Sequence, residues 1–183
     1  MLVAKRVATM SHDDLAQFLS GALSTGRHVL TKQMIKRHLK AIIGSTKEPD
    51  FVVFVPQERK SYAVELKDGD QFDTKKAAGE VANIKTFARA LHGYLLEKRL
   101  DYVVDIRFCF FNQNDRTAIV DGMKREINVA QAMTGADFCR LIGADYKAIV
   151  AERQADAADN LEYFCSRLCD MLDIRKILIG KLN

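Results

Sequence analysis

Three charged residues around a predicted β-hairpin are the candidates for chemistry in this sequence: Asp50, Glu65 and Lys67. Asp50 enters a continuous apolar, β-branched run at residues 51–55, and Glu65 and Lys67 leave a second strand-like run at residues 61–67. Charged side chains beside buried strands are uncommon unless they are paired or bind a metal. The ends of this hairpin are therefore where a functional site is expected.

The hairpin register predicts that Asp50 and Glu65 face each other. A turn centred near Gln57 and Glu58 pairs residues whose numbers sum to about 115, which sets Asp50 opposite Glu65. Directly paired side chains have Cβ atoms only about 4.5 to 5.5 Å apart. Two carboxylates at that distance repel each other unless a cation lies between them. Strand alternation puts Lys67 on the same face as Glu65.

Such a cluster of hard oxygen ligands suits Mg²⁺, which keeps several waters and completes its shell with substrate phosphate. Phosphodiester hydrolysis needs a metal that polarises the phosphate, an activated water and a cation near the developing charge. We expect Asp50, Glu65 and the backbone carbonyl of Leu66 to bind the metal. Lys67 would orient or help deprotonate the attacking water and stabilise the developing charge. The alternative is a surface hairpin with an exposed ion pair between Glu65 and Lys67.

Helices are predicted on both sides of the hairpin. A capping box that starts at Ser11 predicts a helix over about residues 12–23. Thr31 opens a second helix, for which Gly44 is the expected C-terminal cap. After an acidic loop, apolar residues that recur at intervals of three and four predict a long helix over about residues 75–97.

One more strand and further helices follow in the C-terminal half. Residues 102–111 have the composition of a strand. Thr134 and Asp137 form a second capping box, and Gly143 is the expected end of that helix. A last amphipathic helix over about residues 152–173 has enough apolar surface for a dimer seam, although packing on its own sheet would explain it equally well.

The order helix, helix, strand, strand, helix, strand, helices predicts an α/β fold whose central sheet is covered by helices. No linker or internal repeat divides the chain. We therefore expect a single domain over residues 1–183: helices over 11–44, the hairpin, helix and strand over 45–112, and a helical C-terminal part over 113–183.

Composition permits several partners and argues against a membrane span. The 183 residues are 48% hydrophobic and 28% charged, which is typical of a globular protein. The formal net charge of +4 permits a polyanionic partner without requiring one. No window approaches about 18 uninterrupted apolar residues, and residues 1–10 lack a signal h-region. We expect a protein of the cytoplasm with no membrane partner.

The four cysteines match no zinc-binding spacing. Two of them, Cys165 and Cys169, lie four residues apart on the apolar side of the last predicted helix. We expect Cys109, Cys139 and these two to be buried thiols.

The hairpin motif resembles that of the PD-(D/E)xK nuclease superfamily: Pro49–Asp50, a spacer of fourteen residues, and Glu65–Lys67. The resemblance covers roughly residues 45–112. The run ELKDGDQFDTKK at residues 65–76 is similar to segments of type II restriction endonucleases. The resemblance implies a restriction-endonuclease-like central mixed sheet flanked by helices. It also implies Mg²⁺-dependent, site-specific cleavage of double-stranded DNA by a homodimer.

One difference from the superfamily's exonucleases indicates which branch of the superfamily the chain resembles. The recombination-type exonucleases usually carry a Gln-x-x-x-Tyr pattern on the helix after the lysine, whereas residues 77–82 here read AAGEVA. An endonuclease is therefore favoured. The rivals are a structure-selective nuclease such as a junction resolvase, and a non-catalytic DNA-binding module that keeps the fold.

Many members of the superfamily use a further acid from a neighbouring helix, and Glu80 is the candidate here. The alternative is a solvated glutamate in the first helical turn, where the helix dipole favours it.

Basic residues on two predicted helices are candidates for contacts with the DNA backbone. Three of them recur every fourth residue, which would align cations along a phosphate backbone. The candidates are Lys32, Lys36, Arg37, Lys40, Lys75 and Lys76. The alternative is a solvated helix face. The segment 135–150, a helix, glycine and helix, could mimic a helix-turn-helix, but a packing role is favoured.

Overall fold

A computed structural model describes residues 26–39, 47–67 and 76–170, except for the side chains of His38 and of 164–170. The predicted helix at 12–23 and the predicted C-terminal cap Gly44 lie outside the described residues. The second predicted helix ends at His38, with Leu39 as its C-terminal cap, before that glycine is reached. The chain divides into two units, Met1–Ala144 and Asp145–Asn183. The single domain expected from the sequence stays a prediction.

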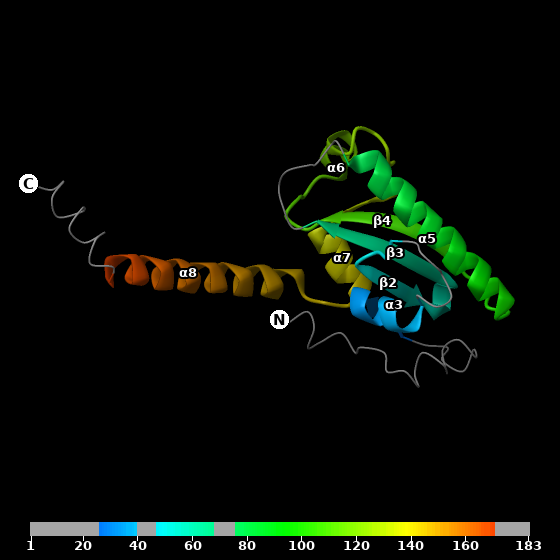
Figure 1. Cartoon of the computed structure of the whole chain (residues 1–183), viewed down its shortest axis with the longest axis horizontal. Coiled ribbons are helices and arrows are strands. Elements are labelled where there is room, and N and C mark those ends of the chain that lie inside the picture. The colour runs from blue at the N-terminus through cyan, green and yellow to red at the C-terminus, as the bar shows by residue number, and fades with distance from the viewer. Residues whose placement is uncertain (1–25, 40–46, 68–75, 171–183) are drawn as a thin grey trace, which may run out of the picture. The chain divides into compact units, whose positions relative to one another are not determined.

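The described strands form one five-stranded mixed sheet in the order β1-β2-β3-β4-β5 (Figure 1). The pairs β1–β2 and β2–β3 are antiparallel, and the pairs β3–β4 and β4–β5 are parallel. The strands are β1 His28–Thr31, β2 Phe51–Val55, β3 Lys60–Lys67, β4 Val103–Phe110 and β5 Ala132–Thr134. The predicted α/β class with a central mixed sheet is confirmed, and it is consistent with the restriction-endonuclease-like fold.

The two outer strands of this sheet, β1 and β5, were not predicted from the sequence. They have four and three residues, HVLT and AMT. Runs this short cannot display the alternation of apolar and polar residues by which a strand is recognised. Their pairing with a longer neighbour defines them.

Helices cover both faces of the sheet in the first unit. The helices of this unit are α3 Lys32–His38, α5 Ala77–Glu97, α6 Arg116–Gly122 and α7 Gly135–Ile142. The long helix predicted near 75–97 is confirmed. The predicted stop at Gly143 is also confirmed, because this residue ends α7 with a φ of 74°, a left-handed conformation that glycine adopts without strain.

The second unit contains α8, Tyr146–Asp170, which begins six residues before the predicted start at 152. The reason is an overlooked N-terminal cap. The Asp145 carboxylate accepts hydrogen bonds from the backbone N–H groups of Lys147 and Ala148. None of the helices in the described part of the chain is long and apolar enough to cross a membrane.

The predicted hairpin register is confirmed. Phe51 pairs with Val64, and Val55 pairs with Lys60. Between the strands, Pro56–Glu58 forms a short 3-10 helix, and Arg59 follows with a left-handed φ of 48°. The turn therefore fixes which residues of β2 and β3 share a face.

Strand alternation divides the hydrophobic residues into two cores. On β3, Ala63 belongs to the core between the sheet, α3, α5 and α6, whereas Tyr62 and Val64 belong to the core beneath α7. The side chains that α5 buries are Ala77, Val81, Ile84, Phe87, Ala88, Leu91 and Leu95. The same alternation directs Glu65 and Lys67 to the α5 side.

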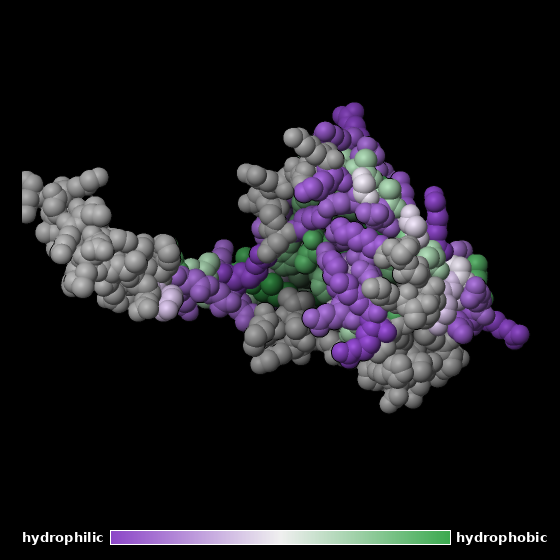
Figure 2. Space-filling view, viewed as in Figure 1, coloured by the Kyte–Doolittle hydropathy of each residue, from purple (hydrophilic) through white to green (hydrophobic). Residues whose placement is uncertain are grey.

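In the view of Figure 2, hydrophilic residues cover most of the described surface, and hydrophobic ones are set back between them.

Two of the predicted buried thiols are confirmed. The side chains of Cys109 and Cys139 are both buried. Burial raises the pKa of the Cys109 thiol far above its ordinary value, so this side chain stays a neutral thiol. The side chains of Cys165 and Cys169 lie outside the described part.

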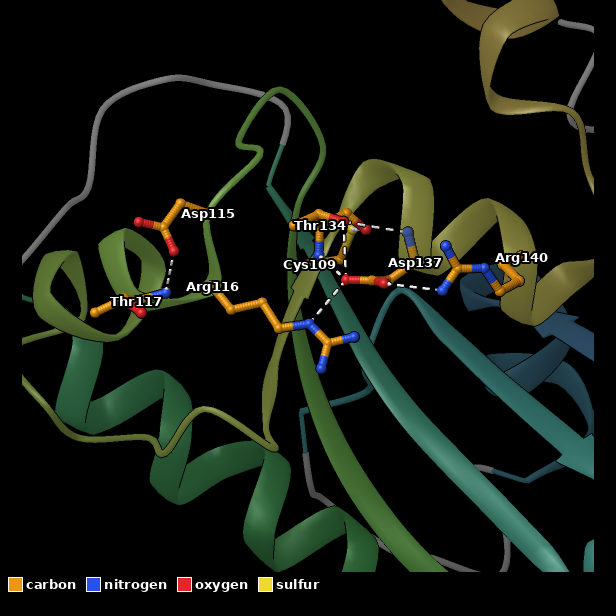
Figure 3. A network of polar contacts seen from close by, with 7 residues as sticks. All are labelled: Cys109, Asp115, Arg116, Thr117, Thr134, Asp137 and Arg140. Carbon is orange, nitrogen blue, oxygen red and sulfur yellow. Dashed lines mark hydrogen bonds and ion pairs between the residues drawn. The ribbon is translucent and has the colours of Figure 1, made fainter.

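The predicted capping box at the start of α7 is confirmed and is joined by two arginines (Figure 3). Thr134 donates from its N–H and its hydroxyl to the Asp137 carboxylate, and its hydroxyl accepts from the Asp137 N–H. Arg116 and Arg140 also donate to Asp137. Burial alone would raise the pKa of Asp137, but the hydrogen bonds from Arg116 and Thr134 outweigh it and lower the pKa to about 2.

We predict that Asp137→Asn lowers the free energy of unfolding by about 1 to 2 kcal/mol at neutral pH, because it removes a charged cap. The pKa of Asp137 in the folded chain lies below its ordinary 3.8. The stabilisation by the ionised Asp137 carboxylate is therefore complete above pH 3.8 and is lost as the pH falls towards 2. Urea unfolding across this pH range measures the difference.

Asp121→Asn is the matched control. Both side chains of the Asp121–Arg125 ion pair are exposed, so this pair should contribute little to the free energy of unfolding. Equal stability of Asp137→Asn and the unaltered chain at neutral pH would contradict the prediction.

Candidate active site

Asp50 lies immediately before β2, on the side of the sheet that α5 covers. Its Oδ2 atom accepts a hydrogen bond from the Leu66 N–H at 2.9 Å. The pairing of Phe51 with Val64, continued by one residue, sets Asp50 opposite Glu65. The structure thus brings together the two carboxylates that the sequence predicted to face each other.

Glu65 is a buried carboxylate, with only 8% of the residue exposed. Burial raises its pKa, and the negative charge of Asp50 raises it further, while Lys67 acts in the opposite direction. Burial and the charge of Asp50 therefore disfavour the charged form of Glu65 more than Lys67 favours it.

Lys67 lies between two carboxylates. Its Nζ atom is 3.2 Å from Oε1 of Glu65 and 2.8 Å from Oε1 of Glu80. Burial alone would lower the pKa of Lys67, but the hydrogen bond and charge of Glu80, with those of Glu65, outweigh it and raise the pKa. Lys67 is therefore a charged ammonium here. Its ion pair with Glu65 is mostly buried, unlike the exposed pair considered as the alternative.

Glu80 reaches the same group from the first turn of α5. Its carboxylate contacts Lys67, and its side chain is mostly buried. It is thus not a solvated glutamate that only faces the helix dipole. The structure places it with the other three predicted residues, and its role as a further acid stays a prediction.

Lys32 joins this group from the start of α3. Its Nζ atom donates to Oδ1 of Asp50 at 2.9 Å, and this hydrogen bond raises the pKa of Lys32. In the sequence, Lys32 was a candidate only for contact with the DNA backbone. The missed signal is the pairing of β1 with β2: Thr31 lies beside Phe51, so the next residue falls beside Asp50.

A small pocket opens beside these side chains between the residues before β2, the end of β3 and the first turns of α5. Two of its polar residues, Glu48 and Asn83, were not predicted. Its lining residues are Lys47, Glu48, Pro49, Glu65, Glu80, Asn83 and Ile84. Motif spacing alone does not identify them, because Glu48 precedes β2 and Asn83 is on α5, and the two line one pocket only where α5 packs on the sheet.

The donor atoms present fit a hard divalent cation. No group of three or more His, Cys, Asp or Glu side chains in the described part is arranged to bind a metal, but the predicted set needs only two carboxylates and one carbonyl. The N–H and C=O of a strand residue point to the same side, so the Leu66 carbonyl is directed towards the Asp50 side. Opposed oxygen donors of this kind suit Mg²⁺.

The remaining DNA-contact candidates lie on two separate elements. Lys36 and Arg37 are exposed on α3, and Lys76 is exposed just before α5. Lys40 and Lys75 lie outside the described residues. Contact between any of these side chains and DNA stays a prediction.

Comparison with known proteins gives one named relative. The chain is similar to the Type II restriction enzyme HhaII of Haemophilus parahaemolyticus, with 32% identity over 142 residues. The match covers 77% of this chain and 60% of that enzyme, so the chain spans less than two thirds of the relative's length. No family model matches, and no solved structure matches. The relative supports the resemblance to restriction endonucleases.

We predict that Lys67→Met destabilises the metal-free chain by about 1 to 3 kcal/mol, because it leaves the buried Glu65 carboxylate without its cation. Lys32→Met is the matched comparison. Its ion pair with Asp50 is more exposed and should contribute less than about 1 kcal/mol. Urea unfolding in EDTA measures both values. A larger loss for Lys32→Met than for Lys67→Met would contradict this account of the site.

Proposed function

We propose that this chain is a Mg²⁺-dependent, site-specific endonuclease that hydrolyses phosphodiester bonds of double-stranded DNA. The observation that carries the proposal is the arrangement of Asp50, Glu65 and Lys67 on one face at the open end of the β2–β3 hairpin. The similarity to a type II restriction enzyme supports the same activity.

Asp50, Glu65 and the Leu66 carbonyl would bind the metal. When bound, Mg²⁺ polarises the phosphate and makes a water nucleophilic at neutral pH. The chain orients the Asp50 carboxylate before substrate arrives, because the Leu66 N–H and Lys32 each donate a hydrogen bond to a different oxygen of Asp50. Such prior orientation reduces the reorganisation needed during reaction.

Lys67 supplies positive charge next to the reacting phosphate. Its raised pKa keeps it protonated at neutral pH, which suits stabilisation of the developing negative charge and orientation of the attacking water by hydrogen bonding. A protonated Lys67 does not itself accept the proton of the water. Glu80 holds the ammonium from the opposite side and acts as a positioning residue.

The proposal includes a homodimer and a basic surface for the DNA backbone. Two protomers would cut the two strands of a short palindrome. The C-terminal helix α8 exposes Leu161 and Tyr163, apolar side chains that suit a dimer seam. Lys36, Arg37, Lys40, Lys75 and Lys76 would contact phosphates.

We predict that the chain converts plasmid DNA into discrete fragments in the presence of Mg²⁺ and that EDTA abolishes cutting. Lys67→Ala should lower the rate at least about 100-fold, because it removes the cation that stabilises the developing charge. Gel electrophoresis of timed digests measures the rate. Lys98→Ala is the matched control, since that ammonium lies over the Tyr94 ring at the far end of α5.

Two other results would each change the conclusion. DNA binding without cleavage in either Mg²⁺ or Mn²⁺ contradicts the enzyme assignment. Preferential cutting of a four-way junction over linear duplex contradicts site-specific cleavage in favour of a structure-selective nuclease.

A further inference from the structure

A second charged cluster lies at the same edge of the sheet as Lys67. The register places Lys67 beside Phe110 and Phe110 beside Thr134, so the three residues form one row across β3, β4 and β5. Neighbouring strands are about 4.8 Å apart, which puts Thr134 roughly 10 Å from Lys67. Thr134 is the residue that binds Asp137 in the α7 capping box.

Two arginines converge on Asp137 at this edge (Figure 3). Arg116 comes from the start of α6, and its Nε atom donates to Oδ2 of Asp137 at 2.9 Å. Arg140 comes from α7, and its Nη1 atom lies 3.4 Å from Oδ1. The Asp137 side chain is 14% exposed, whereas those of Arg116 and Arg140 are 44% and 76% exposed. The carboxylate is thus covered, and the cations face solvent.

The hydrogen bond to Asp137 holds the Arg116 guanidinium by one of its three nitrogen atoms. Of its nitrogen atoms, Nε is the one that binds Asp137, and no partner for Nη1 or Nη2 is found among the described residues. A guanidinium held at Nε presents the remaining N–H groups as a planar fork. Such a fork matches paired acceptors, either two phosphate oxygens or the O6 and N7 atoms of guanine.

Capping of α7 does not require either arginine. The Thr134 hydroxyl and the Asp137 carboxylate already satisfy both halves of the capping box. The ion pair with Arg116 joins residues 21 apart and leaves the guanidinium at the surface, where an ion pair contributes little stability. The arrangement is therefore suited to positioning Arg116 rather than to holding the fold together.

We propose that Arg116, positioned by Asp137, presents its Nη fork to the DNA duplex that is cut beside Lys67, with Arg140 as a second cation on the same duplex. This inference rests on the proposed nuclease function. A separation of roughly 10 Å lies within the width of one major groove, about 12 Å. One bound duplex can therefore contact both positions.

The test is DNA binding by the full chain in Ca²⁺, an ion with similar oxygen ligands, used in place of Mg²⁺. A fragment that the unaltered chain cuts in Mg²⁺ is compared with one that it does not cut, at several salt concentrations. Arg116→Gln should weaken binding to the cut fragment about tenfold or more. Arg125→Gln is the matched control, because its exposed ion pair with Asp121 lies at the other end of α6.

The salt dependence distinguishes the two acceptors. If Arg116 contacts phosphate, Arg116→Gln weakens binding to both fragments and lowers the salt slope by about one, and Arg116→Lys restores part of the affinity. If it contacts guanine, the loss is confined to the cut fragment, and Arg116→Lys restores little because the fork is lost. Urea unfolding of both variants separates a loss of contact from a loss of folding.

Failure of this inference is distinguishable from failure of the proposed function. Suppose that the unaltered chain cuts DNA, and that Arg116→Gln is folded and binds both fragments as tightly as the unaltered chain at every salt concentration. The inference about Arg116 is then overturned, and the nuclease function stands. If the unaltered chain binds DNA without cutting it, the nuclease function fails. The affinities of Arg116→Gln and of the unaltered chain for a duplex of random sequence then still decide whether Arg116 contacts DNA. A chain that binds no DNA overturns both.

Discussion

The like charges of Asp50 and Glu65 across the open end of the β2–β3 hairpin are the constraint on which the rest of the site depends. Two carboxylates on one face, one of them buried, are unfavourable without cations nearby. The chain supplies Lys32 on the outer side of Asp50 and Lys67 beside Glu65. The sheet and α3 bring these four side chains together from separate segments, and α5 adds Glu80, which pairs with Lys67.

Carboxylates at these positions lower the stability of the fold, and a functional site explains why the chain has them. Hydrophobic side chains at the same positions would avoid both desolvation and repulsion. A protein that needs a divalent cation, however, gains from carboxylates that are already oriented and not fully neutralised. Charged side chains at this end of the sheet also extend beyond the carboxylates, since Lys67 lies two strands from Thr134 and the arginines at Asp137.

Local sequence information predicted the hairpin and therefore the pairing of Asp50 with Glu65. A turn with a defined centre and two apolar runs fix the register, and alternation then fixes the face on which Lys67 lies. Glu80 was a candidate because many members of the superfamily that the motif resembles use a further acid from a neighbouring helix, and the helical period of α5 places Glu80 in its first turn. These features depend on neighbours along the chain.

Features that depend on distant segments were not predicted. The position of Lys32 requires β1, a strand too short to recognise, to pair with β2. The contact between Arg116 and Asp137 requires α6 and α7 to meet at the end of β5. Glu48 and Asn83 share a pocket only because α5 packs on the sheet.

Calorimetric titration with Mn²⁺, an ion that accepts the same oxygen ligands as Mg²⁺, tests the central claim most directly, since it reports on the carboxylate pair without DNA or turnover. We expect the unaltered chain to bind the ion. Asp50→Asn and Glu65→Gln should each weaken binding at least about tenfold, since each removes a charged ligand. Asp105→Asn, whose carboxylate is paired with Arg107 on β4, should bind as the unaltered chain does. Equal Mn²⁺ affinity in the unaltered chain, Asp50→Asn and Glu65→Gln would contradict the assignment of these carboxylates to a metal site.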